Sequence, residues 1–144
     1  MKVLVVNGPN LNLLGSRQTE IYGKKTLADI TRSLRKAFPK VDFHFFQTNS
    51  EGEIIDQIHT AVDGDYAGII INPGAYSHYS YAIRDALSAV NVPVIEVHLS
   101  NIHKREEFRR KSVISAACTG VVSGFGETSY VLAVQALMEA VQKK

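Results

Sequence analysis

A glutamate and a histidine in one apolar run have the types and spacing that acid–base chemistry needs. Glu96 and His98 are two residues apart, so in a strand both side chains project from the same face. A carboxylate beside an imidazole can fix its tautomer and raise its basicity. An ordinary buried histidine near a strand end would give the same pattern, but the place of this pair at a predicted binding edge favours the functional interpretation.

Two further segments bring polar side chains of catalytic type. The stretch 7–23 is far longer than a connection between two elements usually needs, and it carries Arg17 and Tyr22 five residues apart. A loop of this length is typical of a lid or a ligand-contacting segment, although Tyr22 taken alone is more typical of an amphipathic loop residue than of a base. Arg105 and Arg109 follow at i,i+4 on one face of a predicted helix. For Arg105 and Arg110, a charged helix face or a subunit contact is the alternative.

The stretch 72–78 has the character of an anion-binding turn. It begins Asn-Pro-Gly, and the backbone N–H groups at the start of the following helix are free to hold a negative charge. Gly74 permits a close approach of the backbone, or simply forms the turn. His78 is either a ligand or a cap of the next helix.

Side chains for several other chemistries are missing. Neither G-x-G-x-x-G nor a Walker pattern follows the first apolar run, and no carboxylate cluster of metal-binding type occurs. We find no cysteine or serine nucleophile with its own base, and no lysine inside a predicted buried strand that could form a Schiff base. What remains is acid–base chemistry on a small, polar, anionic molecule, with no metal.

Composition narrows the class of protein further. The chain has 144 residues, 45% of them hydrophobic, with a formal net charge of +2, and we expect one domain over residues 1–144. This charge argues against a broad nucleic-acid-binding face. The lone Cys118 excludes an internal disulfide and an all-cysteine metal site. No apolar run approaches a membrane span and no signal peptide is evident, so the expected location is the cytoplasm.

The elements that must position these side chains follow from five apolar runs. The strands are expected at residues 3–6, 41–46, 68–72, 92–97 and 119–123. Four of these runs are almost continuous in valine and isoleucine, as expected where helices cover both faces of a parallel sheet. The second alternates, with Phe43 between Asp42 and His44, which indicates an edge strand.

Helical patterns alternate with these strands. Thr26 and Asp29 form a capping box before the first, and Ser50 and Glu53 open the second. The inward positions of four helices are expected to be Leu27, Ile30, Leu34 and Phe38, then Ile55, Ile58 and Val62, then Ile83, Leu87 and Val90, and finally Tyr130, Val134, Leu137 and Val141. A short polar helix is expected over 103–110.

Five such units predict an α/β fold with three layers. The arrangement is a flavodoxin-like doubly wound five-stranded parallel sheet with strand order 2-1-3-4-5. Such sheets bind ligands beyond the carboxyl ends of their strands, near the point where strand order reverses. The site should therefore involve residues that follow the first, third and fourth strands.

Several motifs, taken in their order along the chain, resemble those of one family. Residues 7–15 (Asn-Gly-Pro-Asn-Leu-Asn-Leu-Leu-Gly), with the following Arg17 and Tyr22, and then 72–75, 96–101 and 105–109, closely resemble type II 3-dehydroquinate dehydratase. The resemblance covers essentially the whole chain. It implies a cofactor-free lyase that eliminates water from 3-dehydroquinate in the anti sense, through an enolate, to give 3-dehydroshikimate. The same chemistry would serve aromatic amino acid biosynthesis or quinate breakdown.

The resemblance also implies a role for individual residues. Tyr22 would be the base, with Arg17 favouring its anionic form, His98 the acid, and Asn10 the holder of a water against the enolate oxygen. The other implied residues contact the substrate or support the site: Asn72, Gly74, Ala75, His78, Asp85, Leu99, Ser100 and Arg109 for the substrate, and Glu96, Pro9 and Arg105 in support. The substrate carboxylate would be bound by Asn72 and by the backbone N–H groups of residues 99 and 100. Asp85 would reach a neighbouring subunit in trimers that assemble into a dodecamer.

Two other classes of protein share the predicted fold. A phosphoacceptor receiver domain needs an acidic cluster after the first strand and an aspartate after the third, where this chain has Asn7 and Asn72. A flavin electron carrier needs a Ser/Thr-rich phosphate loop that Pro9, Leu11 and Leu13 do not supply. A non-enzymatic oligomeric scaffold remains compatible with the composition, and incubation with substrate would distinguish it.

Overall fold

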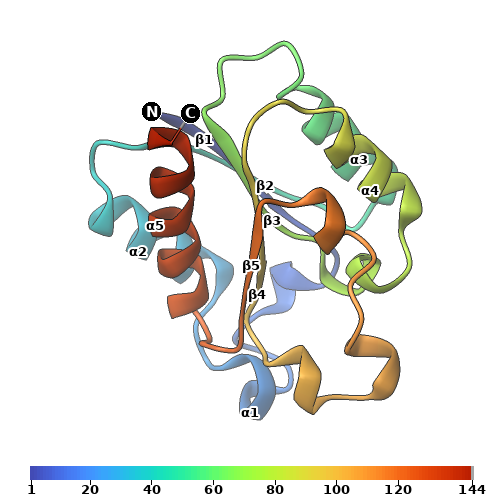
Figure 1. The fold of residues 1–144 in the computed structure, drawn as a ribbon. Coiled ribbons are helices and arrows are strands. Elements are labelled where there is room, and N and C mark those ends of the chain that lie inside the picture. Colours follow the sequence, from blue (N-terminus) through green and yellow to red (C-terminus); the bar gives the residue numbers. More distant parts are fainter. Residues whose placement is uncertain (144) are drawn as a thin grey trace.

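The apolar runs form one parallel sheet in the predicted order, β2-β1-β3-β4-β5. The computed structural model describes residues 1–143 (Figure 1). The strands are β1 (Lys2–Asn7), β2 (Asp42–Gln47), β3 (Gly68–Asn72), β4 (Val94–His98) and β5 (Gly120–Ser123). Strand order reverses between β1 and β3, so the carboxyl ends of β1, β3 and β4 flank the expected binding edge.

Helices cover both faces of the sheet, as Figure 1 shows. The helices α2 (Leu27–Ala37) and α5 (Thr128–Gln142) lie on one face, and α3 (Glu51–His59) and α4 (Tyr81–Ser88) lie on the other. A short helix, α1 (Thr19–Tyr22), lies near the carboxyl edge of the sheet. The flavodoxin-like three-layer prediction is confirmed.

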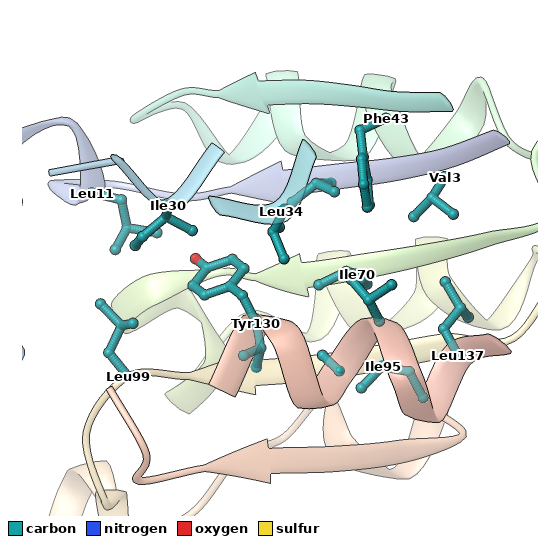
Figure 2. Packing of buried hydrophobic residues seen from close by; sticks show 14 of the residues in the cluster. Val3, Leu11, Ile30, Leu34, Phe43, Ile70, Ile95, Leu99, Tyr130 and Leu137 are labelled. Atoms are coloured by element: carbon teal, nitrogen blue, oxygen red, sulfur yellow. The ribbon is translucent and has the colours of Figure 1, made fainter. Parts of the chain in front are cut away.

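Alternate residues of the central strands feed two separate cores. Val3 and Val5 belong to the cluster beneath α2 and α5, and Leu4 and Val6 to the one beneath α3 and α4. Figure 2 shows the first cluster, with sheet residues facing helix residues that include Leu34, Tyr130 and Leu137. Burial on both faces explains why the sequence of β1 is continuously apolar.

Hydroxyl caps fix the starts of three helices. Thr26 and Asp29 form the predicted reciprocal capping box. Ser50 accepts from the backbone N–H of Glu53 at 3.3 Å. Ser80 accepts from that of Ile83 at 3.1 Å, which sets where α4 begins after the turn that follows β3. Each cap of this kind stabilises its helix by about 1 kcal/mol.

The predicted helix over 103–110 is wrong. The segment forms two 3-10 turns, Ile102–Lys104 and Glu107–Arg109, with Arg105 extended between them (φ −104°, ψ −169°). The segment is short and has no apolar stripe to bury, so local caps decide its path. Arg105 and Arg109 consequently do not share a helical face at i,i+4.

The predicted inward face of α3 also needs correction. Ile54 and Ile58 are fully buried, and Ala61 follows them, whereas Val62 is 39% exposed. Two adjacent isoleucines at 54 and 55 leave the phase of this helix ambiguous in the sequence. Since α3 ends at His59, helical spacing cannot be extended as far as Val62. Val90 also lies beyond the end of its helix, α4, at Ser88, but it packs against the core as predicted.

The two edge strands differ from the three central ones. Phe43 of β2 is buried between exposed Asp42 and His44, which confirms the alternation predicted for an edge. On β5, Val121 is 46% exposed, so the expectation that helices cover both faces of this strand is wrong. Among residues 1–143, no helix is long and apolar enough to cross a membrane.

Candidate active site

A cavity of about 130 Å³ lies at the predicted edge, beyond the carboxyl ends of β1, β3 and β4. It brings together every residue that the sequence analysis assigned to the site except Asp85 and Glu96. Leu11 and Ile102 also line it, and only their apolar character marks these two residues in the sequence. The cavity thus lies where the topological rule predicted the site.

The His98 side of the cavity is buried. The imidazole Nε2 is hydrogen-bonded to the Glu96 carboxylate, and His98 and Glu96 are 6% and 0% exposed. Ser115 Oγ donates to the other oxygen of Glu96 at 2.6 Å. Burial alone would raise the pKa of Glu96, but hydrogen bonds from His98 and Ser115 outweigh it and hold that pKa below its ordinary value. Glu96 is thus an anion that orients His98 and leaves Nδ1 for the cavity.

Ser115 is a supporting residue that sequence reasoning missed. It lies 19 residues beyond Glu96, in a 3-10 turn that precedes β5. No spacing rule connects a serine in a turn with a carboxylate on a strand, so only the folded structure identifies the contact.

His78 is held as a neutral imidazole. Burial lowers its pKa, and its Nδ1 lies 2.9 Å from the carbonyl oxygen of Lys111. A carbonyl only accepts, so Nδ1 carries the proton and Nε2 is left as an acceptor. The ring lies 6.5 Å from that of His98, nearly parallel at 18°. His78 can therefore accept a hydrogen bond from a ligand hydroxyl.

Tyr22 lies between two arginines. Arg105 Nη1 donates to the Tyr22 hydroxyl at 2.8 Å and to Ser100 Oγ at 3.3 Å. The guanidinium carbons of Arg17 and Arg105 lie 5.3 and 5.0 Å from the centre of the tyrosine ring. The predicted Arg17–Tyr22 proximity is confirmed, but the cation on the hydroxyl itself is that of Arg105. Tyr22 thus lies against two guanidinium groups, one of which donates to its hydroxyl.

The turns that follow β1 and β3 press closely together. Gly74 has a φ of +60°, and a Cβ there would lie 3.1 Å from the carbonyl oxygen of Pro9. A Cβ on Gly8 would lie 2.5 Å from the carbonyl oxygen of Pro73. Gly74 thus has both the left-handed backbone and the close approach that require glycine. Its N–H donates to Asn72 Oδ1 at 3.2 Å, which holds the asparagine at the cavity.

The backbone after β4 is fixed by the loop that follows β5. The carbonyl oxygens of His98, Leu99 and Ser100 each accept a hydrogen bond from the segment 123–126, at 3.3, 2.9 and 2.9 Å. With three successive carbonyls held, the peptide planes of this segment cannot rotate freely. Its N–H groups therefore form a rigid part of the cavity wall.

Two predicted site residues lie outside the cavity lining. Glu96 is behind His98 and acts through it. Asp85 is exposed on α4. No group of three histidine, cysteine, aspartate or glutamate side chains with the geometry of a metal site occurs among residues 1–143. The cavity is lined by cationic and neutral polar groups, which suits a small polar anion.

Fold and site together define a flavodoxin-like protein equipped for acid–base chemistry on a small anion. More specifically, the chain belongs to the class II dehydroquinase family, whose model, described as "Dehydroquinase class II", matches residues 1–138. It is 60% identical over 140 residues to a 3-dehydroquinate dehydratase of Caldicellulosiruptor bescii, covering 96% of this chain and 97% of that protein. A protein of the same name from Pelodictyon phaeoclathratiforme is 57% identical, with coverage of 96% and 92%.

Solved structures agree with this assignment. The crystal structure of the type II dehydroquinase from Butyrivibrio crossotus superposes with a TM-score of 0.94 at 45% identity, covering 96% of this chain and 97% of that one. The type II dehydroquinase of Propionibacterium acnes gives a TM-score of 0.91 at 44% identity, with 96% of each chain covered.

Proposed function

We propose that this chain is a lyase that removes water from 3-dehydroquinate to give 3-dehydroshikimate, a reaction of the shikimate pathway. Its family and the names of its relatives support that activity. One observation carries the proposal: a tyrosine hydroxyl held by an arginine and a histidine held by a buried glutamate line the same cavity. That is the pair of groups that an elimination of water requires.

In the first step, the Tyr22 oxygen takes a proton from the carbon next to the ketone. The electron pair of that C–H bond forms the enolate, and the guanidinium groups of Arg17 and Arg105 stabilise the tyrosine anion that begins the step. Asn10 holds a water against the developing enolate oxygen, which supplies a preorganised donor. Its position supports this role, because its backbone N–H is anchored to Asn49 Oδ1 at 3.1 Å.

In the second step, the enolate collapses and the C–O bond to the leaving hydroxyl breaks. His98 gives its Nδ1 proton to that oxygen, and water departs on the face opposite to the proton that Tyr22 removed. The buried Glu96 carboxylate stabilises the imidazolium from which this proton comes. Each positioned acid or base is typically worth about 10²–10⁴-fold in rate.

The substrate carboxylate binds to Asn72 and to the backbone N–H groups of Leu99 and Ser100. Arg109 and His78 hold the ring hydroxyls, and His78 does so as an acceptor through Nε2. Pro9, Gly74 and Ala75 shape the wall through the close contact of their two turns. We assign these roles from the positions of the side chains in the cavity and from the family.

The proposal extends to the organisation of the protein. Residues 1–144 act as one catalytic domain, without a cofactor and without a nucleic-acid partner, in the cytoplasm. Trimers assemble into a dodecamer in which the exposed Asp85 reaches the site of a neighbouring subunit. Sedimentation analysis of the purified protein tests the dodecamer. A comparison of the activity of Asp85→Ala with that of the wild type tests the role of Asp85.

The central test follows the ultraviolet absorbance of the conjugated enone product after mixing the protein with 3-dehydroquinate. Wild-type protein should produce it, and Tyr22→Phe should lose at least 10²-fold in kcat while it still binds the substrate. Tyr66→Phe removes a tyrosine hydroxyl from outside the cavity lining and should leave the rate unchanged. Retention of more than a few per cent of activity by Tyr22→Phe would refute Tyr22 as the base.

Two further experiments separate the remaining roles. His98→Ala should slow the departure of the hydroxyl, and unchanged turnover would remove His98 from the mechanism. Borohydride added with substrate should not inactivate the enzyme, since no Schiff base forms. Folded protein with no turnover at all would leave a scaffold that binds a related ring acid.

A further inference from the structure

A fully buried tyrosine adjoins the proposed carboxylate site without lining it. Tyr130 lies on α5 and is 0% exposed. Figure 2 shows its ring over the sheet near Ile30 and Leu99, at the end where the strands terminate, with its hydroxyl oxygen in red. A core position on a helix needs only an apolar side chain, so the hydroxyl calls for a separate explanation.

The hydroxyl joins two buried asparagines. Asn72 Nδ2 donates to Tyr130 Oη at 3.0 Å, and Tyr130 Oη donates to Asn7 Oδ1 at 2.6 Å. Asn7 and Asn72 are 1% and 4% exposed, and they are paired in register at the ends of β1 and β3. The three side chains therefore form a short chain of hydrogen bonds behind the cavity wall.

The hydrogen bonds that link Asn72, Tyr130 and Asn7 can run in only one donor-to-acceptor direction. The backbone N–H of Gly74 can only donate, so the Asn72 atom that it contacts at 3.2 Å must be the oxygen Oδ1. The other amide atom, facing Tyr130, is then Nδ2, and the tyrosine oxygen must accept from it. Tyr130 consequently gives its own proton to Asn7. Burial raises the pKa of Tyr130 above its ordinary value, so the hydroxyl keeps that proton across the physiological range.

We infer that Tyr130 is a positioning residue for substrate binding: it holds the Asn72 amide with one Nδ2 hydrogen on the tyrosine oxygen, so that the second is presented to the substrate carboxylate. The inference rests on the proposed function, in which Asn72 binds that carboxylate. Without the tyrosine oxygen only the Gly74 N–H, at 3.2 Å, would hold the amide, and a rotation that presents Oδ1, which repels an anion, would cost that one hydrogen bond. Tyr130 prevents the rotation because its hydroxyl proton is committed to Asn7.

The first experiment is Tyr130→Phe, which keeps the ring and removes only the hydroxyl. KM for 3-dehydroquinate should rise about tenfold or more, the size expected for one hydrogen bond to a charged group. The kcat should change less than about threefold, because Asn72 holds the carboxylate equally before and during the reaction. Tyr66→Phe is the matched control. A fall in kcat that follows the folded fraction, with KM unchanged, would show a merely structural role and overturn the inference.

A double-mutant cycle with Asn72→Ala separates this inference from the proposed function. If Tyr130 acts through Asn72, adding Tyr130→Phe to Asn72→Ala should raise KM no further. Additive effects would mean another route and overturn the inference. If Asn72→Ala itself leaves KM unchanged, the proposed carboxylate site is wrong and the inference fails with it. If Asn72→Ala raises KM and Tyr130→Phe does not, only the inference fails.

A pair of ligands gives a readout that does not depend on turnover. A ring carboxylate that inhibits competitively should bind about tenfold more weakly to Tyr130→Phe, and its carboxamide should bind both proteins equally. Equal weakening of the two ligands would contradict the inference. Should Tyr130→Phe not fold, Asn7→Ala keeps the ring and hydroxyl but releases the hydroxyl proton. It should raise KM several-fold, and no change would count against the inference.

Discussion

The two side chains that we propose as base and acid are held in opposite ways. His98 ends a central strand and is fixed by a buried carboxylate, with its exposed fraction at 6%. Tyr22 ends a four-residue helix in the loop over residues 10–23, half-buried, with an exposed arginine on its ring. We refer to the two regions as the acid wall, made by β3 and β4, and the base loop, residues 10–23.

The backbone shows the same difference. Within the base loop, Asn10, Gly15, Gln18 and Gly23 have positive φ values of 68°, 87°, 42° and 84°. Non-glycine residues in this region cost of order 1–3 kcal/mol and persist where surrounding contacts hold them. The strands of the acid wall have no such residue. The proposed acid is therefore positioned by a regular strand, whereas the proposed base is positioned by the contacts of an irregular loop.

The largest contrast should appear in thiol reactivity. Burial, with Glu96 nearby, raises the pKa of the Cys118 thiol to about 12. A cysteine introduced into the base loop as Ser16→Cys, in a Cys118→Ala background, is exposed and should titrate near 8.5. At pH 8 the loop thiol should react with a maleimide about 10³-fold faster than Cys118. Cys118 precedes β5 and lies near Glu96, behind the acid wall, and equal rates would mean that the base loop is no more open than that position.

The next contrast concerns the negative charge of Glu96, which lies behind His98. Glu96→Gln keeps the shape of the side chain and removes the anion that orients His98, so kcat should fall roughly 10²-fold. The steady-state rate of product formation measures this. Asp65→Asn, an exposed carboxylate paired with Lys2, is the matched control and should change nothing. A loss of less than about threefold in Glu96→Gln would show that burial alone holds His98.

Sequence reasoning reached the acid wall more fully than the base loop. The alternation around Phe43 identified β2 as an edge strand, and with it the strand order and the cavity position. Glu96 and His98 are two residues apart, so strand geometry was enough to pair them. Sequence spacing of this kind predicts contacts between residues that lie in the same helix or strand.

The remaining contacts depend on residues far apart in the chain. Arg105 reaches the Tyr22 hydroxyl across 83 positions, from an extended residue between two 3-10 turns that the sequence presented as a helix. Tyr130 was correctly placed in the core by its helical spacing, but its hydroxyl partners lie on β1 and β3. Neither contact can be predicted from the helical or strand spacing of residues that are close in the sequence.

A smaller effect is expected on the base loop. Arg105→Ala removes the donor to the Tyr22 hydroxyl and should lower kcat about tenfold, the value of one hydrogen bond from a charged group. Arg105→Lys should recover part of the loss, because lysine can donate to the same oxygen. Arg32→Ala on α2 removes an exposed arginine and serves as the control. No change in kcat for Arg105→Ala would leave Arg17 as the cation that matters.

The smallest expected effect is on stability in acid. The pKa of Glu96 is lower in the folded protein than in the unfolded chain, so the ionised carboxylate stabilises the fold. This contribution is complete above the unfolded pKa, near 4.3, and is lost as the pH falls through the lower folded value. His98, Ser112, Ser115 and Cys118 are polar groups that face it. Urea unfolding between pH 5 and pH 3 should therefore show a steeper loss of free energy in wild type than in Glu96→Gln. Parallel curves would mean that the acid wall owes its rigidity to packing rather than to this anion.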